Sequence, residues 1–163
     1  MESIIHPKVS VITVVYNDVE HIRETIESFF SQTWEEKEYI VIDGGSTDGT
    51  ADVVREYADQ LSYWCSEADK GIYDAMNKGI EKATGDWINF LNCGDYYATA
   101  DSLRNVMESE HAETADVLFG DSIAVIEECR KEETAPSDVS LLEMIPTFRH
   151  GSSLIRTSVQ RPY

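Results

Sequence analysis

Polar side chains follow three apolar stretches of this sequence, each at the point where the stretch ends. They are Tyr16 and Asn17, then Asp43, then Asn92 and Asp95. A carboxylate at such a point suits hydrogen bonding to a nucleobase or a ribose better than contact with a phosphate. Carboxylates also bind divalent metals, which can neutralise an anionic substrate. These residues can act together only if the fold brings the ends of the three stretches to one place.

The apolar stretches predict strands, and the segments between them predict helices. A continuous run of apolar or β-branched residues is typical of a strand buried on both faces, as in a parallel sheet. Strands are predicted over residues 9–15, 39–42, 63–65, 86–91 and 116–120, the last extended by 122–126. Apolar residues at helical spacing predict helices over 18 to about 32, 51–61, 72–83 and 103–107, the first with Asp18 as its N-cap.

The alternation of strands and helices predicts an α/β domain with a mostly parallel sheet and helices on both of its faces. Sheets of this kind bind ligands beyond the carboxyl ends of their strands. The five polar residues named above all follow predicted strands, so they are expected to meet at that edge. The alternatives are an ordinary surface turn at Asp43 and a tight turn leaving the sheet at 92–95.

The net charge limits what the chain can bind. It has 13 Lys and Arg against 31 Asp and Glu, a formal net charge of −18. Binding to nucleic acid or to anionic lipid depends on Lys and Arg, so both partners are disfavoured. An anionic substrate would need an added cation, and a divalent metal held by a few carboxylates is the economical choice. The acidity could also serve solubility alone.

The composition is that of one ordinary globular domain. The chain has 163 residues, 42% of them hydrophobic and 27% charged, which suffices for one core but hardly for two. No apolar run approaches the roughly 20 residues that span a bilayer, and the N-terminus lacks the pattern of a secretory signal. The three cysteines are widely spaced, as expected of reduced thiols. We therefore expect a cytoplasmic domain without a membrane span.

The glycine-rich segment 43–50 matches neither common phosphate-binding motif. Its glycines do not have the G-x-G-x-x-G spacing of dinucleotide-binding folds. Gly44 and Gly49 do match the glycines of a P-loop, but Thr50 stands where that motif needs a Lys. Asp43 also directs a negative charge toward the site. A P-loop enzyme is therefore disfavoured.

Four segments taken together resemble glycosyltransferase family 2. They occur in the order and at the spacings typical of bacterial members that build cell-surface polysaccharide, and they are residues 9–17, 41–50, 69–80 and 83–95. The family is similar in fold to the GT-A class, a nucleotide-binding α/β sheet followed by an acceptor region. A match at any one segment would be weak, but the four together are highly specific.

The resemblance implies transfer of a sugar from a UDP- or GDP-sugar to an acceptor hydroxyl, with inversion, in cell-surface polysaccharide or lipopolysaccharide synthesis. The acceptor would be a saccharide or a lipid-linked saccharide, reached from the cytoplasm or the inner face of the membrane. Within a single domain, 1–163, the nucleotide-sugar-binding half would cover about residues 8–98 and an incomplete acceptor half about 99–163. The family's general base would follow beyond this segment. An incomplete domain could also pair as a homodimer.

The resemblance also assigns roles to residues of the donor site. Tyr16 would lie against the base, Asp43 would bond the base, and Asn17 would sit beside them. Asp74 and Asn77, in the predicted helix 72–83, would line the donor pocket.

A divalent ion, Mn or Mg, is implied at the end of the fourth strand. Family members carry a D-x-D-type signature there, and Asp95 would be the metal ligand. Asn92 stands where Asp is commoner, and Gly94 replaces another acidic residue. Asn92 could bond a ribose hydroxyl or offer a neutral carbonyl. Metal affinity without the donor is expected to be weak, because one carboxylate remains.

Later residues leave alternatives open. Asp121 is assigned to acceptor or donor contact. His150 would either contact phosphate or metal or be a partly buried histidine bonded to backbone. Arg149 and Arg156 would either offset phosphate charge or be surface cations. Trp87, inside an apolar stretch, is expected in the core.

Two other functions remain open. A nucleotidyltransferase would normally carry a Gly-rich, Arg- or Lys-bearing loop after the first strand, and residues 15–18 contain neither Gly nor a cation. A chain that binds a nucleotide-sugar without transferring it is the other alternative, because the sequence identifies no general base.

Overall fold

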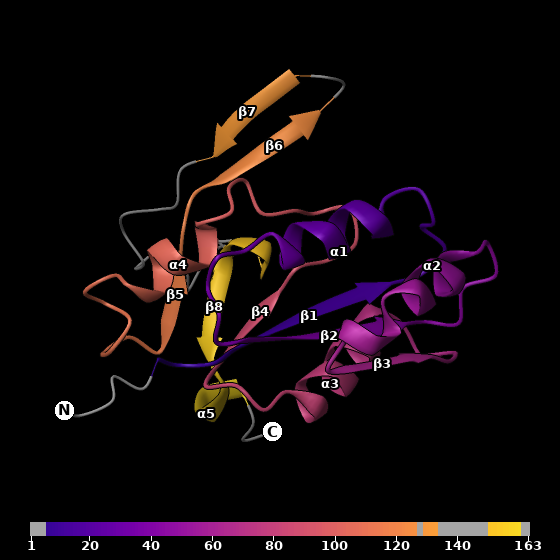
Figure 1. The fold of residues 1–163 in the computed structure, drawn as a ribbon, viewed down its shortest axis with the longest axis horizontal. Coiled ribbons are helices and arrows are strands. Elements are labelled where there is room, and N and C mark those ends of the chain that lie inside the picture. The colour runs from indigo at the N-terminus through magenta and orange to yellow at the C-terminus, as the bar shows by residue number, and fades with distance from the viewer. Residues whose placement is uncertain (1–5, 127–128, 134–149, 161–163) are drawn as a thin grey trace.

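The computed structural model describes residues 6–126, 129–133 and 150–160 (Figure 1). Its centre is a six-stranded sheet with the strand order β3-β2-β1-β4-β8-β5. The strands are β1 (Val9–Val15), β2 (Lys37–Asp43), β3 (Tyr63–Ser66), β4 (Trp87–Phe90), β5 (Val117–Phe119) and β8 (Ser153–Arg156). The first four run parallel, whereas β8 is antiparallel to both β4 and β5. The predicted α/β fold with a mostly parallel sheet is therefore confirmed.

Helices cover both faces of the sheet, as predicted (Figure 1). Side chains of β1 alternate between the faces because successive residues of a strand point in opposite directions. Val9, Val11 and Val15 pack toward α1, α2 and α4, while Ile12 and Val14 pack toward α3. The helices are α1 (Ile22–Phe30), α2 (Thr50–Glu56), α3 (Ile72–Lys82), α4 (Ser102–Met107) and α5 (Thr157–Gln160), with 3-10 turns η1 (Ala58–Gln60) and η3 (His150–Ser152).

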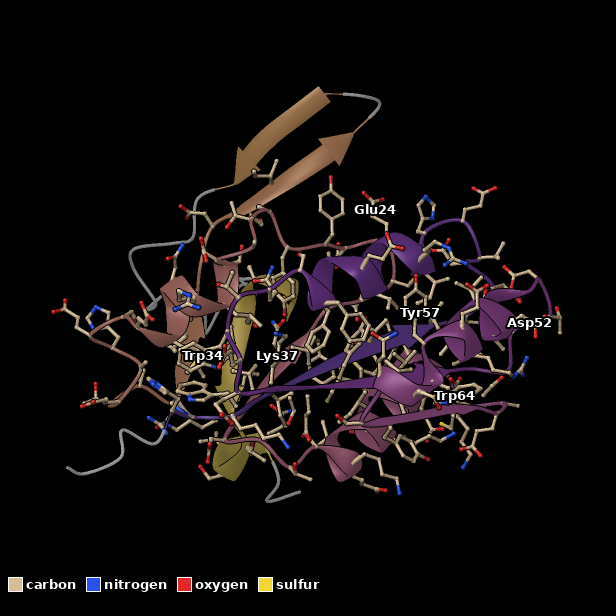
Figure 2. All side chains as sticks on the ribbon, in the orientation of Figure 1. Glu24, Trp34, Lys37, Asp52, Tyr57 and Trp64 are labelled. Carbon is tan, nitrogen blue, oxygen red and sulfur yellow. The ribbon has the colours of Figure 1, made fainter. Side chains whose placement is uncertain are left out.

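The helix pair α1 and α2 is joined by a tyrosine near the end of α2 (Figure 2). The Tyr57 hydroxyl donates to Glu27 of α1 at 2.9 Å and accepts from Arg23 of α1 at 2.9 Å. These bonds fix α1 and α2 to each other on the outer side of the helices.

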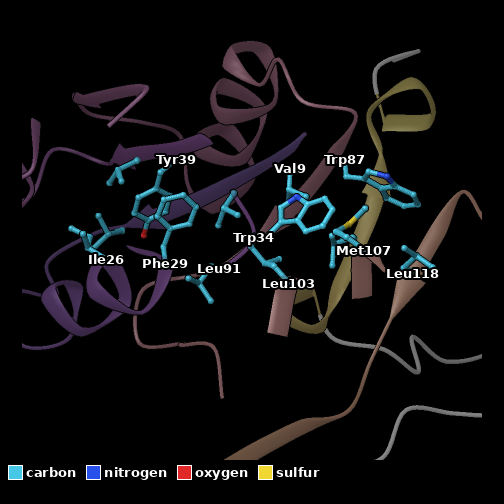
Figure 3. Close-up of a cluster of buried hydrophobic side chains, with 14 of the residues drawn as sticks. Val9, Ile26, Phe29, Trp34, Tyr39, Trp87, Leu91, Leu103, Met107 and Leu118 are labelled. Atoms are coloured by element: carbon cyan, nitrogen blue, oxygen red, sulfur yellow. The ribbon is translucent and has the colours of Figure 1, made fainter. Parts of the chain in front are cut away.

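The larger core lies between the sheet and the α1, α2 and α4 layer (Figure 3). Trp87 is fully buried there, which confirms its prediction as a core residue, and Trp34 lies in the same cluster. Phe29 stacks on Tyr39 with ring centroids 4.2 Å apart. Because helices cover both faces of the sheet, a ligand is expected at the strand ends.

Two predicted elements are wrong in detail. The first helix begins at Ile22 rather than after Asp18, and residue 21 at its N-cap makes no side-chain capping bond. Asp18 has long-range partners instead: its N–H donates to Thr50 Oγ1 at 3.0 Å, and its carboxylate lies 3.4 Å from Cys93 Sγ. These contacts hold residues 16–21 in a loop.

Residues 122–126 do not extend β5. They form β6 (Ser122–Ile126), which pairs with β7 (Cys129–Glu133) in a separate antiparallel two-stranded sheet. This hairpin projects away from the main sheet (Figure 1). The chain leaves the main sheet at Gly120, whose N–H donates to Ser152 O at 2.9 Å. Among the described residues, no helix has both the length and the apolar character needed to cross a membrane.

A buried polar network joins the elements at the edge of the sheet opposite the predicted site. Glu38 of β2 accepts hydrogen bonds from Ser10 Oγ at 2.6 Å and from the N–H and hydroxyl of Thr84 at 2.6 and 2.8 Å. Lys8 Nζ lies 2.6 Å from the same carboxylate. Burial alone would raise the pKa of Glu38, but the bonds from Lys8, Ser10 and Thr84 outweigh it and lower the pKa to about 2.

Candidate functional site

The ends of β1, β2, β3 and β4 meet along one edge of the sheet, as expected from the sequence. Asp43, the last residue of β2, lies opposite Val15 of β1 and Ser66 of β3. After β4, the N–H of Cys93 donates to Val14 O at 3.3 Å, so the loop that starts at Asn92 passes the end of β1. The fold thus brings the three predicted polar groups to one side of the molecule.

Asp43 is fully buried below this edge. Its carboxylate accepts hydrogen bonds from the Ser46 N–H at 3.0 Å, from the Ser46 hydroxyl and from the Ser66 hydroxyl at 2.5 Å. Asp43 therefore shapes the loop after β2 and fixes it to β3. Its predicted bond to a base stays a prediction, and a base would have to share a carboxylate that already has these partners.

Asn17 joins the loop after β1 to the loop after β2. Its side-chain oxygen accepts from the Thr47 N–H at 2.8 Å, and its own N–H donates to Ser46 Oγ at 2.7 Å. Its φ of 50° lies in the left-handed region, which Asn tolerates better than most residues. Asn17 thus orients the neighbouring Tyr16, whose side chain is 66% exposed.

Asp69 is a candidate site residue that reasoning from the sequence missed. A Cβ placed on Gly44 would fall 2.6 Å from Asp69 Oδ2 and 3.3 Å from Cδ2 of Tyr16. The carboxylate therefore fills the space that a side chain at position 44 would need, beside an exposed aromatic ring. Asp69 Oδ1 accepts from the Gly71 N–H at 2.7 Å, which holds the side chain in place. The available signal was an acid two residues before the glycine that precedes α3.

The first turns of α3 carry the two other predicted donor-site residues. Asp74 accepts from the Lys70 N–H at 3.2 Å and lies 3.7 Å from Lys78 Nζ. Asn77 is exposed three residues later, on the same side of the helix. Tyr73, between Gly71 and Asp74, is 72% exposed. The structure places these residues at the start of α3, and their contact with a donor stays a prediction.

Asn92 and Asp95 form the two ends of a tight turn after β4. The Asp95 N–H donates to Asn92 O at 2.9 Å, and Gly94 between them has a φ of 91°, which favours glycine. The Asp95 side chain is exposed. Asn92 Oδ1 is buried and accepts no hydrogen bond within the described part of the chain.

These two side chains fit a hard divalent ion only in part. A carboxylate and an amide oxygen are ligands that Mg²⁺ accepts, and this ion keeps several waters or phosphate oxygens as further ligands. Across residues 6–126, 129–133 and 150–160, no group of three or more His, Cys, Asp or Glu could hold a metal. The protein would therefore supply the exposed Asp95 carboxylate, and Asn92 only if its buried amide oxygen turned outward, while the ligand's phosphates would complete the coordination.

Cys93, inside the same turn, is a structural thiol. Burial and the nearby Asp18 carboxylate raise its pKa to about 12. The thiol therefore stays protonated at neutral pH and donates to Asp18 Oδ2 at 3.4 Å. A protonated thiol is neither a nucleophile nor a good metal ligand.

The candidate residues in the C-terminal part of the chain have different positions in the structure. Arg156 donates to the carbonyl oxygens of Ala115 and Ala112 at 2.6 and 2.9 Å, and its guanidinium lies over the Trp87 ring at 4.6 Å. It therefore holds a loop in place and is neither a phosphate ligand nor a solvated cation. Asp121 is exposed at the start of the β6–β7 hairpin. Arg149 and the side chain of His150 lie outside the described residues.

Comparison with known proteins identifies the family. The model of Glycosyl transferase family 2 matches residues 10–157. An uncharacterised glycosyltransferase of Mycobacterium tuberculosis is 39% identical over 104 residues, which cover 63% of this chain and 40% of the relative. The PGL/p-HBAD biosynthesis glycosyltransferase of Mycobacterium bovis BCG is 36% identical over 122 residues, covering 72% of this chain and 47% of that protein. The chain thus spans less than half the length of these relatives.

Solved structures share the fold. TarS of Staphylococcus aureus, residues 1–349 in complex with UDP, aligns with a TM-score of 0.76 over 94% of this chain and 48% of that one, at 21% identity. The mannosyltransferase PcManGT of Pyrobaculum calidifontis, in complex with GDP-Man and Mn2+, aligns with a TM-score of 0.72 over 94% of this chain and 45% of that one, also at 21% identity. Both neighbours are GT-A glycosyltransferases, which confirms the predicted GT-A-like fold.

Proposed function

Because this chain belongs to glycosyltransferase family 2, we propose that it supplies the nucleotide-sugar-binding part of a sugar transferase. The donor is a UDP- or GDP-sugar, and its sugar is transferred with inversion to a hydroxyl of a saccharide or lipid-linked acceptor. The reaction belongs to the assembly of a cell-surface polysaccharide or glycolipid at the cytoplasmic face of the membrane. One relative's name, which refers to PGL/p-HBAD biosynthesis, supports this class of product.

The observation that carries the proposal is the arrangement around Gly44. An exposed aromatic ring, Tyr16, and a carboxylate oxygen of Asp69 both border the space above this glycine. An aromatic ring can stack on a nucleobase, and a carboxylate can accept from ring N–H groups or ribose hydroxyls. Asp43 and Asn17 stabilise the two loops that hold this pair, and Asp74 and Asn77 extend the same edge toward the diphosphate and sugar.

The diphosphate of the donor would lie near Asp95 and Asn92. These residues would hold a Mn or Mg ion, which when bound stabilises the negative charge that develops on the leaving diphosphate. Asp95 would contribute the negative oxygen. The amide oxygen of Asn92 is buried, so the side chain would have to turn outward to contribute a neutral oxygen or to accept a ribose hydroxyl. The hydrogen bond from the Asp95 N–H to Asn92 O holds the two residues at the ends of one tight turn.

The donor-binding half of this domain covers about residues 8–98, and residues 99–163 begin the acceptor half. Binding of the donor without transfer is the second candidate function, because the described residues include no acid with an assigned role as general base. The β6–β7 hairpin and β8 follow the donor half, where an acceptor region would be built. Donor hydrolysis by this chain distinguishes transfer chemistry from binding alone.

Calorimetry with UDP, with and without Mn²⁺, tests the proposed site. We expect Asp95→Asn to lose the gain in UDP affinity that Mn²⁺ gives, a change of roughly 10- to 100-fold for loss of a charged partner. UDP binding without metal should change little. The matched control is Asp59→Asn, because exposed Asp59 lies in η1, which follows α2 toward the opposite edge of the sheet. A full metal response in Asp95→Asn would remove this residue from the metal site.

A further inference from the structure

Asn89 is a polar side chain in a strand that is otherwise a core element. All four residues of β4 are buried, and Asn89 itself is 1% exposed. A buried amide costs free energy unless hydrogen bonds satisfy it. Asn89 Oδ1 accepts from the Tyr97 hydroxyl at 2.6 Å, and Nδ2 donates to Ser153 O at 2.8 Å and to Gly151 O at 3.4 Å. One amide therefore joins two segments that are far apart in the sequence.

Both segments lie near Asp95. Tyr97 follows Asp95 by two residues, just after the turn that carries its carboxylate. Gly151 lies in η3, which leads into β8, the strand that pairs with β4. The hydrogen bonds of Asn89 thus fix the Asp95 turn and η3 to the same point on β4.

The backbone of η3 is close to the Asp95 carboxylate. A Cβ placed on Gly151 would fall 3.3 Å from Asp95 Oδ2 and 3.8 Å from Phe90 O. Gly151 is not among the glycines with a left-handed φ, so the limited space, rather than backbone strain, favours glycine there. A movement of η3 toward Asp95, or a side chain at position 151, would therefore meet the carboxylate.

We propose that Asn89 is a positioning residue for the proposed donor site. Through Tyr97 on one side and Gly151 on the other, it sets the direction of the Asp95 carboxylate toward the donor's diphosphate and its cation. This inference rests on the proposed function. It also explains why β4 carries an amide at a position where an apolar side chain would be buried at lower cost.

Changing Asn89 itself would leave several buried groups without partners, so we test it through its neighbours. Tyr97→Phe removes the hydroxyl that bonds Asn89, and Gly151→Ala places a methyl group against Asp95. The matched controls are Tyr57→Phe, which removes a bonded hydroxyl between α1 and α2, and Gly120→Ala. Gly120 also contacts η3, but a Cβ there meets nothing within 4 Å.

Titration calorimetry with UDP, with and without Mn²⁺, is the readout. Tyr97→Phe and Gly151→Ala are expected to weaken Mn²⁺-dependent UDP binding about 10-fold or more, as loss of a group that orients a metal ligand does. UDP affinity without metal should stay within about twofold, and both controls should behave like the unchanged protein at equal thermal stability. Unaltered Mn²⁺-dependent binding in both test variants would overturn the proposal.

Crystal structures separate this result from failure of the proposed function. If the unchanged protein does not bind UDP, the proposed function is wrong, whatever Asn89 does. The Asp95 carboxylate is expected to change direction in Tyr97→Phe and Gly151→Ala and to keep its direction in both controls. A carboxylate that stays in place in both test variants would overturn the positioning role independently of any ligand.

Discussion

The position of the Asp69 carboxylate requires a glycine at position 44. A Cβ placed on Gly44 would lie only 2.6 Å from Asp69 Oδ2, which is closer than two such atoms can approach. A side chain at position 44 would therefore displace the Asp69 carboxylate. The missing side chain thus makes room for an acid supplied from a different loop. That acid lies beside Tyr16, where a stacked base would present its hydrogen-bonding edge.

Asp69→Ala should weaken UDP binding without metal by roughly 10-fold, because a carboxylate hydrogen bond to the nucleoside is lost. Calorimetry without metal is the measurement, and Asp59→Ala is the control. Gly44→Ala is a second route to the same effect, since it keeps the carboxylate but displaces it. Equal UDP affinity in both variants and in the unchanged protein would exclude Asp69 from the base site.

At the scale of elements, a hydrogen-bond network around Glu38 joins neighbouring strands at the edge of the sheet opposite the candidate site. Glu38 of β2 bonds Ser10 of β1 and Thr84, which precedes β4, so one carboxylate joins three neighbouring parts of the sheet. The same β1–β2 pairing places Ser10 opposite Glu38 at one end and Val15 opposite Asp43 at the other, and Asp43 also lies opposite Ser66 of β3. The hydrogen bonds of Glu38 at the start of β2 therefore help to keep the strand register that positions the loop after Asp43.

The lowered pKa of Glu38 predicts a pH dependence of stability. Because the carboxylate is favoured in the folded state, its contribution is present above the unfolded pKa of 4.5 and is lost as pH falls toward about 2. We expect this contribution to be on the order of 2 kcal/mol, allowing for the partly exposed Lys8 partner. Urea unfolding from pH 7 to pH 2 should show a shallower decline for Glu38→Gln than for the unchanged protein.

Glu81→Gln is the control for that experiment, because Glu81 is exposed on α3. Its decline with pH should match that of the unchanged protein. Parallel curves for Glu38→Gln and the unchanged protein would show that the network does not favour the ionised carboxylate.

The sequence predicts the elements whose signals are local. Continuous β-branched runs identified β1 and β2, and their parallel pairing follows from the helices between them. The meeting of the polar residues at one edge also follows, because residues that come after parallel strands share an edge of the sheet. Trp87 was recognised as a core residue from its apolar neighbours.

The features that were missed depend on long-range contacts. Asp18 is not an N-cap because its carboxylate contacts the His21 ring and the distant Cys93, while its N–H donates to Thr50. Residues 122–126 pair with β7 rather than continuing β5, which periodicity within one segment cannot show. Asp69 became a candidate site residue only because the fold places its carboxylate beside Gly44. Local patterns carry no information on such pairings.

For the whole molecule, both the net charge of −18 and the carboxylates near the candidate site disfavour binding of an anionic diphosphate. Asp43, Asp69, Asp74 and Asp95 all lie at or near the open edge of the sheet, so a diphosphate would meet negative charge there. A divalent cation held by Asp95 would offset this negative charge when a diphosphate binds. Binding of a nucleoside diphosphate should therefore depend strongly on the metal, whereas a nucleoside alone should not.

A crystal structure of this protein with UDP and Mn²⁺ tests the central claim most directly. The base is expected against Tyr16, within hydrogen-bonding distance of Asp69 or Asp43. The ion is expected to bridge the diphosphate and the Asp95 carboxylate. UDP bound away from the ends of β1, β2 and β4, or an ion that joins the diphosphate without touching Asp95, would contradict the account.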